Sequence, residues 1–510
     1  MNTDRPIDDG MDSESARRLP LDSPVHGGIE KGFGRTPEVI HSPSYSRRRF
    51  LECAACGFGS IALQAMLADL ACAAQSPLAG REPHFAPRAK RVIFLFMAGG
   101  PSQHDLFVPK PRLVRDHGQR VGVTNLPRGI PVGTDKFLTL GPAAEFAPRG
   151  QSGAMISNLL PHLAGVADEL CFLHGMQVDN PAHDLATLQF NTGVINEVRP
   201  SLGAWASYGL GTENANLPSY ISIFPGSDVR AHGSAFLPAA HQGTVIGNIP
   251  KDPKESAIRY LNDPQTTHAA QRRQIDFVQA MNRRLLDRVV EDRVMEGVMD
   301  SFELAFRMQA ETPKLVDLSG ESPETLKAYG VDGKATDKNA RACLLARRLC
   351  EAGVRFVQVT IGGWDHHGNI RGALPNTCAE ADQPVAALIA DLKTRGLLDD
   401  TLVVWSGEFG RTPWSQDLSG TAPIETHGRE HQPESFTAFL AGGGVRRGFS
   451  FGQTDEFGYQ VVEGRVHIHD LHATILHLLG LDHERLTYRH AGRDYRLTDV
   501  YGNVVQEILA

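Results

Sequence analysis

Six continuous apolar runs, rich in β-branched residues, each end in a glycine-rich or polar loop. Runs of this kind are typical of strands buried on both faces of a sheet. They lie at 91–100, 169–176, 219–224, 354–363, 401–408 and 436–444. Helical patterns separate them, most clearly at 183–193, 338–352, 378–395 and 470–480. Strands that alternate with helices predict an α/β fold with a mostly parallel central sheet sandwiched by helices.

The N-terminal part of the 510-residue chain differs from the rest in composition. Residues 1–45 are polar and rich in Pro, Gly and charge, which predicts disorder. Residues 46–74 begin with "SRRRFL", continue through an apolar stretch from Ala54 to Ala68 and reach "ACA" at 71–73. This pattern predicts a twin-arginine export signal. The apolar stretch is shorter than the roughly 20 residues that a helix needs to cross a bilayer.

We therefore expect an exported, periplasmic protein that uses the twin-arginine export machinery and has no stable membrane span. Because that machinery carries folded proteins, it suits a chain that acquires a metal in the cytoplasm. The formal charge of −8 over the whole chain provides no basic surface for nucleic acid or for anionic membranes, and we exclude nucleic acid as a partner. The α/β domain would occupy 90–510, with a helical insertion or lid at about 268–310.

Four loops next to the predicted strands carry carboxylates, imidazoles or both. They contain Asp105; Asp365, His366 and His367; Glu408 and Arg411; and Glu430 and His431. Ligand sites of open α/β sheets lie outside the carboxyl ends of the strands, so these loops are expected to converge. Each loop alone has a simpler interpretation, because a strand-end Asp often caps a turn. Together they indicate a divalent metal site, with Zn, Mn or Fe favoured over Ca or Mg.

The stretch "GGWDHHGN" at 362–369 divides its polar residues between two faces. On extended backbone, residues two apart point to the same side. Asp365 and His367 are therefore predicted to act together as ligands, and His366 is predicted to point away from the metal.

The histidines and cysteines elsewhere favour structural roles. In "HIHDLHATILHLLG", Asp470 is predicted to cap a helix N-terminus. The leucines around His469, His472 and His477 favour core packing over metal binding. Cys343 and Cys350 are interpreted as small buried residues on a helix.

Several motifs together resemble the bacterial family catalogued as domain of unknown function 1501. They are "FLFMAGGPSQHDLF", "GGWDHHGN", "VVWSGEFGRTP", "GREHQP" and "DLHATILHLLGLDHERLTYRHAGRDYRLTDVYG", and the resemblance spans nearly all of 90–510. That family is similar to the alkaline phosphatase–sulfatase superfamily. The resemblance implies an alkaline phosphatase-like α/β sandwich with a metal site at the carboxyl edge of its sheet.

The resemblance also implies a ligand set. Asp105 matches the first ligand of the superfamily, and Asp365 with His367 matches its Asp…His loop. Glu408 takes the place of the Asp in its Asp-His pair, and His431 matches its last His. Phe409 stands where the paired His is expected, so one metal position loses a ligand.

The nucleophile position is also unusual, because "HDLATLQFNTG" places His183 where the superfamily has Ser, Thr or Cys. His183 would replace the imidazole lost at Phe409, act as nucleophile or general base, or only begin a helix. Thr187, one turn on, is a fallback nucleophile. Arg411 would hold an anionic substrate or form an ion pair.

These observations predict a metal-dependent hydrolase of small anionic phosphate or sulfate esters that uses a metal-activated water. Zn is the first choice of metal, with Mn, Fe or Ca as alternatives. Chemistry through a modified Cys and a mutase or transferase reaction are less favoured, because no Cys, Ser or Thr is placed to carry the group. The alternative is a non-catalytic envelope binding or scaffold protein with a degenerate metal site, which Phe409 and the missing nucleophile support.

Overall fold

The computed structural model describes residues 78–122, 136–251, 257–258, 265–286, 293–417, 419 and 421–510. The region 1–45 that was predicted to be disordered and the signal segment predicted at 46–74 lie outside these residues. Residues Ala73–Ala510 form one compact unit.

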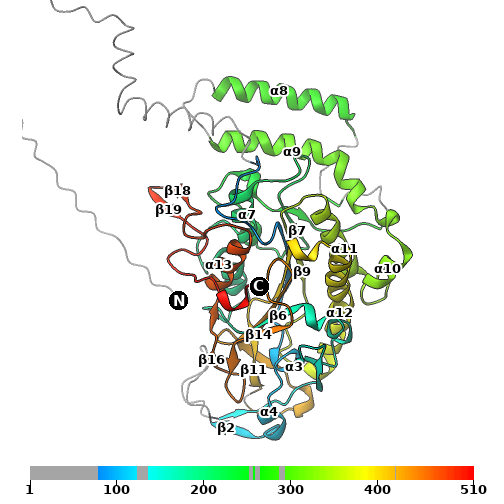
Figure 1. The fold of residues 1–510 in the computed structure, drawn as a ribbon, viewed down its shortest axis with the longest axis vertical. Helices are drawn as coiled ribbons and strands as arrows, with labels where there is room; N and C mark the ends of the chain where they lie inside the picture. Colours follow the sequence, from blue (N-terminus) through cyan, green and yellow to red (C-terminus); the bar gives the residue numbers. More distant parts are fainter. Residues whose placement is uncertain are drawn as a thin grey trace, which may run out of the picture. The chain divides into compact units, whose positions relative to one another are not determined.

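A large central sheet runs through this unit (Figure 1). Its strand order is β14-β6-β13-β10-β1-β9-β7-β8, with β17 beside β6. The strands are β1 (Arg91–Met97), β6 (Leu170–Gln177), β7 (Tyr220–Ile223), β8 (Thr244–Ile246), β9 (Phe356–Ile361), β10 (Thr401–Ser406), β13 (Phe436–Ala441), β14 (Phe449–Phe451) and β17 (Val466–His467). All six apolar runs are therefore strands. Among the described pairings of this central sheet, only those of β13 are antiparallel. The predicted mostly parallel sheet is confirmed.

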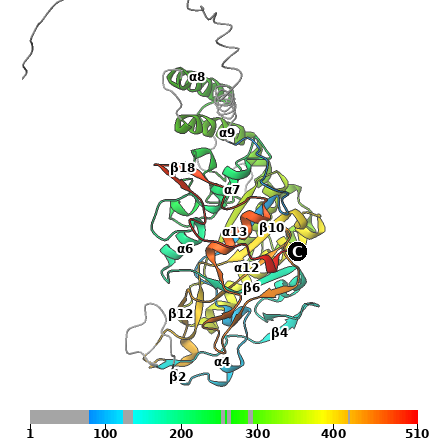
Figure 2. The same cartoon turned by 60° about the vertical axis from the view of Figure 1, so that its left-hand side comes forward.

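Two hydrophobic cores cover the two faces of the sheet, because successive side chains of a strand point to opposite sides. In β1, Ile93 and Leu95 belong to one core, and Phe94 and Phe96 belong to the other. The first core is closed by α11 (Asp337–Glu351) and α12 (Ile370–Thr394). The second is closed by α6 (His183–Thr192), α7 (Leu202–Leu210) and α13 (Ile468–Leu478). The fold is thus a sheet between two helical layers (Figure 2).

The helices follow the predicted patterns, but α12 and α13 begin earlier than predicted. Helix α12 begins at Ile370, eight residues before the pattern at 378–395, and contains Pro375 and Pro384. Proline removes a backbone donor and normally interrupts a helix, which is why the first two turns were not recognised.

Helix α13 begins two residues earlier than its pattern suggested. Its N-cap is His467, so the prediction that Asp470 is the N-cap is wrong. Asp470 is the third helical residue and accepts from the His467 backbone N–H at 2.9 Å, completing a capping box. His469 and His472 bond through Nε2 to the carbonyls of Gly193 and Phe190, at 2.7 and 2.8 Å. These bonds fasten α13 to the end of α6 and confirm the structural interpretation of both residues.

The predicted helical stretch at 268–310 corresponds to α8 (His268–Leu286) and α9 (Arg293–Val316). The two helices pack together through the Gln279 amide on the Met299 carbonyl, at 2.7 Å, and through an ion pair between Arg272 and Glu303, at 2.8 Å.

Short elements complete the fold. The other described helices are α3 (Gln103–Leu106), α4 (Pro111–Arg115), α5 (Pro161–Ala164) and α10 (Pro323–Tyr329). The other described strands form small antiparallel pairs: β2 (Arg120–Gly122) with β3 (Lys136–Leu138), β4 (Phe146–Arg149) with β5 (Ala154–Ser157), β11 (Gly410–Ser415) with β12 (Arg429–Gln432), β15 (Gln453–Thr454) with β16 (Val461–Glu463), and β18 (Tyr488–His490) with β19 (Arg493–Tyr495).

The cysteines of the described residues are all buried and free, including Cys343 and Cys350 as expected. Within the described residues, no helix is long and apolar enough to cross a membrane.

Candidate metal centre

Five segments meet at the carboxyl edge of the sheet. Strands β1, β9 and β10 are parallel neighbours, so the loops that follow them emerge on the same side. Strand β6 has the same direction, since β13 is antiparallel to both β6 and β10. For the same reason β13 starts at the edge where its neighbours end. The β11–β12 ribbon that precedes β13 is therefore delivered to this edge too.

Four side chains form a cluster at this edge. They are His183, the first residue of α6; Asp365 and His367, which follow β9; and His431 in β12. One ligand atom of each lies within 4.8 Å of the corresponding atoms of the others. Asp365 Oδ1 is 2.9 Å from His367 Nε2, 3.3 Å from His183 Nε2 and 3.7 Å from His431 Nε2.

The three distances from Asp365 Oδ1 are close to the separation expected between two ligands of one metal ion. Ligand atoms at about 2.0–2.1 Å from a tetrahedral ion are themselves about 3.3–3.4 Å apart. The Nε2 atoms of His183 and His431 are buried, and within the described structure neither forms a hydrogen bond. A buried polar atom without a partner carries a cost that an ion at this position would remove.

Hydrogen bonds on the far side of the rings orient two of the imidazoles. His183 Nδ1 lies 2.6 Å from Glu408 Oε1, and His367 Nδ1 lies 2.5 Å from Gln416 Oε1. A ring whose Nδ1–H is donated to an oxygen presents Nε2 as the free lone pair, the usual arrangement around protein-bound metals. Glu408 is fixed in turn, because it is 1% exposed and accepts from the Gly99 N–H at 2.9 Å.

The pKa values of the cluster are shifted in different directions. Burial, followed by the positive charges of Arg411 and His183, lowers the pKa of His431 to about 3, so this ring is neutral near pH 7. Burial opposes the charge of Asp365, but the hydrogen bond and charge of Arg411 outweigh it and lower the pKa of Asp365 to about 2. For His183, burial is outweighed by Glu408 and Asp365 and its pKa is raised, so a proton competes with an ion for this ring.

Arg411 is buried and forms an ion pair with Asp365. Its side chain is 0% exposed and donates to Asp365 Oδ1 at 2.5 Å and to the carbonyls of Gly100 and Arg429, each at 3.0 Å, and of Gly99. The guanidinium therefore fixes Asp365 and the loop after β1, and it does not face solvent.

Asp105 lies apart from the cluster, in a buried ion pair with Arg429. The distances are 2.7 Å from Arg429 Nε to Oδ2 and 3.2 Å from Nη2 to Oδ1, and both side chains are fully buried. Ser102 Oγ and the Ala143 N–H occupy the remaining acceptor positions, at 2.5 and 2.6 Å. The carboxylate thus has its charge balanced by a guanidinium. The ion pair could not be predicted from the sequence, because Arg429 lies 324 residues after Asp105.

Phe409, which replaces the expected His, forms an apolar wall beside the cluster. Its ring is fully buried, with ring centroids 4.9 Å from His183 and 4.4 Å from His431. His366 points elsewhere: it is 6% exposed, and its Nε2 lies 3.2 Å from Thr377 Oγ1. Thr187 is half-buried on α6, four residues after His183.

Three supporting residues were missed by the sequence reasoning. Arg429 and Gln416 have no local pattern that reveals a distant partner. Gly428, in "HGREHQP", is a glycine next to polar residues and could have been noticed in the sequence. A Cβ at this position would lie 2.3 Å from the His367 carbonyl carbon. Only glycine permits such close contact between β12 and the loop after β9.

Comparison with known proteins gives a family match and several solved structures. The model of the family described as "Protein of unknown function (DUF1501)" matches residues 89–509. No curated protein sequence matches the chain. The chain is similar to the PsFucS1 sulfatase from Pseudoalteromonas sp., with 15% identity, 78% of this chain and 69% of that chain covered, and a TM-score of 0.33. It is also similar to the lipoteichoic acid synthase LtaP from Listeria monocytogenes (11% identity, 82% and 78% covered, TM-score 0.35). A third similar structure is the phosphonate monoester hydrolase SpPMH from Silicibacter pomeroyi (13% identity, 77% and 73% covered, TM-score 0.27).

Proposed function

The chain belongs to the DUF1501 family, and we propose that it is a metal-dependent hydrolase of phosphate or sulfate esters. One observation carries the proposal: three imidazole Nε2 atoms converge on one carboxylate oxygen, and two of them are buried without a hydrogen bond. In this proposal His183, Asp365, His367 and His431 hold one divalent ion.

The donor set narrows the choice of ion. Three nitrogens and one carboxylate oxygen suit Zn, with Mn or Fe as alternatives, whereas Ca prefers a shell of oxygens. Such an ion, when bound, supplies an activated water and neutralises the negative charge that develops on the leaving oxygen. This chemistry needs no protein hydroxyl or thiol as nucleophile.

The surrounding side chains have distinct roles in the proposed reaction. Glu408 accepts the Nδ1 proton of His183 and keeps that ring in one tautomer, while Arg411 holds Asp365 in place. The cluster is open on one side, since the side chain of Asp365 is 46% exposed and that of His367 is 33% exposed. A small anionic ester would enter from this side, where the water that attacks it also arrives.

Export belongs to the same proposal. The twin-arginine pattern at 46–74 would direct the folded protein to the periplasm, with its metal already bound. The substrate would then be an ester of the cell envelope or of the surrounding medium.

One observation favours a second candidate, a non-catalytic envelope scaffold. Zinc in structural sites is held by four protein ligands, and four protein ligands are present here. If zinc fills the centre with all four, no position is left for water, and the ion only stabilises the fold. A five- or six-coordinate ion, or dissociation of one ligand, leaves room for catalysis.

Metal analysis combined with an ester panel tests the proposal. The purified protein is expected to contain about one equivalent of a transition metal and to hydrolyse at least one chromogenic phosphate monoester, phosphate diester or sulfate ester. His367→Ala is expected to abolish both properties, whereas His366→Asn, a change one residue away, keeps them. A stoichiometric ion without turnover of any ester supports the scaffold, and a protein free of metal after reconstitution rejects both.

A further inference from the structure

Helix α8 exposes large apolar side chains on one face. Phe277 is 65% exposed, Met281 55% and Val278 40%. Buried residues of α8 lie on the opposite side, where Gln279 is 6% exposed against α9. Exposed aromatic and methionine side chains have an unfavourable hydration free energy, which burial against a partner surface would remove.

The exposed face also carries arginine. Arg273, Phe277, Met281 and Arg284 follow one another at spacings of four, four and three residues, so they form one stripe along the helix. Both arginines are exposed. The stripe therefore has two apolar side chains in its middle and a cation at each end.

The arginines of the stripe have no acidic partner among the described residues. Arg272, on the α9 side, is paired with Asp276 at 2.6 Å and with Glu303 at 2.8 Å. Neither Arg273 nor Arg284 forms such an ion pair. Helix α8 contains four arginines and one aspartate, a net charge of +3 in a chain whose total is −8.

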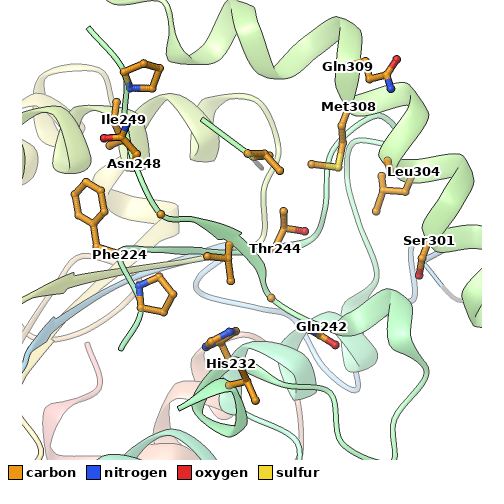
Figure 3. A pocket seen from close by; sticks show the side chains of 18 of the residues that line it. Phe224, His232, Gln242, Thr244, Asn248, Ile249, Ser301, Leu304, Met308 and Gln309 are labelled. Atoms are coloured by element: carbon orange, nitrogen blue, oxygen red, sulfur yellow. The ribbon is translucent and has the colours of Figure 1, made fainter. Parts of the chain in front are cut away.

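The position of α8 leaves this stripe uncovered by the described chain. In Figures 1 and 2, α8 lies on the outer side of α9, away from the sheet. On the inner side, a cavity of about 2070 Å³ separates the two helices from the segments around β7 and β8. Figure 3 shows Leu304, Met308 and Gln309 of α9 on one side of this cavity and Phe224, Thr244 and Ile249 on the other.

We propose that α8 docks on the surface of a bilayer that contains anionic lipids. Phe277 and Met281 enter the boundary between head groups and acyl chains, and Arg273 and Arg284 bind lipid phosphates. A helix with an apolar centre and arginines beside it has the character of an interfacial helix. Charge complementarity selects the lipid over a second copy of the chain, because two such stripes facing each other would bring four arginines together. The proposal does not depend on the metal centre.

Vesicle co-sedimentation of the full chain tests this inference. Binding is expected to vesicles of phosphatidylglycerol mixed with phosphatidylcholine, to be weak on phosphatidylcholine alone, and to fall with added salt. Arg273→Glu with Arg284→Glu is expected to reduce binding by at least about tenfold, since each cation near the surface contributes roughly fivefold. Phe277→Ser with Met281→Ser is expected to reduce it to a similar extent.

Val462→Ser is the matched control. Val462 is 64% exposed, nearly as much as Phe277, but it belongs to β16 and is not part of α8. It is expected to leave vesicle binding unchanged, and circular dichroism shows whether each variant is folded. Equal binding of the wild type and of both double variants overturns the proposal, since a part of the chain other than α8 would then be responsible. A dimer in sedimentation that Phe277→Ser dissociates, without vesicle binding, also overturns it in favour of a second copy.

Discussion

Three carboxylates near the edge of the sheet have three different partners. Asp365 lies among three imidazoles, Glu408 receives the Nδ1 proton of His183, and Asp105 is bonded to Arg429. All three were predicted from sequence as ligands, because each follows a strand of the same sheet. Sequence position locates an acidic residue at the edge, but the residue's role depends on which cation or imidazole faces it in three dimensions.

The variant Asp105→Asn tests whether Asp105 is a partner in a buried ion pair or a metal ligand. The change leaves the Arg429 guanidinium buried without its counter-charge, which costs about 3–5 kcal/mol of unfolding free energy. Metal content is expected to stay at the wild-type value, because Asp105 is outside the cluster. Chemical denaturation and metal analysis of the same sample measure both quantities, and loss of the ion from a folded variant would return Asp105 to the ligand set.

The pH dependence of this variant gives a second readout. Burial opposes the charge of Asp105, but Arg429 outweighs it and lowers its pKa. A lowered folded pKa contributes stability above the unfolded value, about 3.9, and that stability is lost as the pH falls through the folded value. The difference in unfolding free energy between wild type and Asp105→Asn is therefore expected to be largest near neutral pH and to shrink below about pH 4.

Glu408→Gln tests the orientation of His183. The amide keeps the size of the side chain but no longer carries the charge that fixes the Nδ1–H tautomer. Loss of such an outer partner typically weakens metal binding by about 10–100-fold. Competition with a chromogenic chelator measures the change, and Gln416→Glu, next to His367, serves as a comparison in which the charge at the ring is increased. An unchanged affinity in Glu408→Gln would mean that His183 does not bind the ion.

At the scale of elements, the contact between β12 and the loop after β9 decides whether the site forms. Asp365 and His367 come from that loop, and His431 comes from β12, opposite Arg411 in the β11–β12 ribbon. The Arg429 N–H donates to the His366 carbonyl at 3.0 Å, and the Asn369 N–H donates to the Thr426 carbonyl at 2.7 Å. These backbone bonds hold the two segments together independently of any ion.

Gly428→Ala is expected to disturb this contact without altering a ligand. The added methyl would lie 2.3 Å from the His367 carbonyl carbon and 2.4 Å from the His366 carbonyl oxygen, so the backbone must move. Since ligands have to be placed within a few tenths of an ångström, metal affinity is expected to fall by at least about tenfold.

Gly362→Ala is the matched control. Gly362 opens the same Gly-Gly-Trp-Asp stretch, and a Cβ there would meet nothing within 4 Å. Its metal affinity is expected to equal that of the wild type, as measured in the same chelator competition. Equal losses in the two variants would indicate a general effect on loop stability and would contradict the close-contact explanation.

The sequence predicted elements better than contacts. Apolar runs and helical periodicity follow from local burial, so the six strands and most helix limits were predictable. The reversed direction of β13 was not, because an apolar run has the same composition in either direction. The β11–β12 ribbon also escaped prediction. Its buried arginines, Arg411 and Arg429, donate to backbone carbonyls within the ribbon and to Gly100 and Asp105, which lie 311 and 324 residues earlier.

At the scale of the whole molecule, a bound ion would join three segments that are remote in sequence. They are the start of α6, the loop after β9 and strand β12, and they pack against both helical layers through the sheet. An ion that binds only the folded state stabilises it by RT ln(1 + [L]/Kd), about 4 kcal/mol at a thousandfold excess over Kd. Removing the ion is therefore expected to destabilise the entire α/β unit.

Thermal unfolding with and without a chelator measures this effect. The unfolding midpoint of the wild type is expected to fall by several degrees when the ion is removed and to recover when zinc is restored. In a domain of this size, each kcal/mol of lost stability lowers the midpoint by at most about 4 °C. His367→Ala is expected to unfold at the midpoint of the chelated wild type and to be insensitive to the chelator. His469 and His472 lie between α13 and α6, with their Nε2 atoms bonded to carbonyls, so they offer no competing site. A chelator-sensitive midpoint in His367→Ala would locate the stabilising ion elsewhere in the chain and would separate the stability of the fold from the proposed centre.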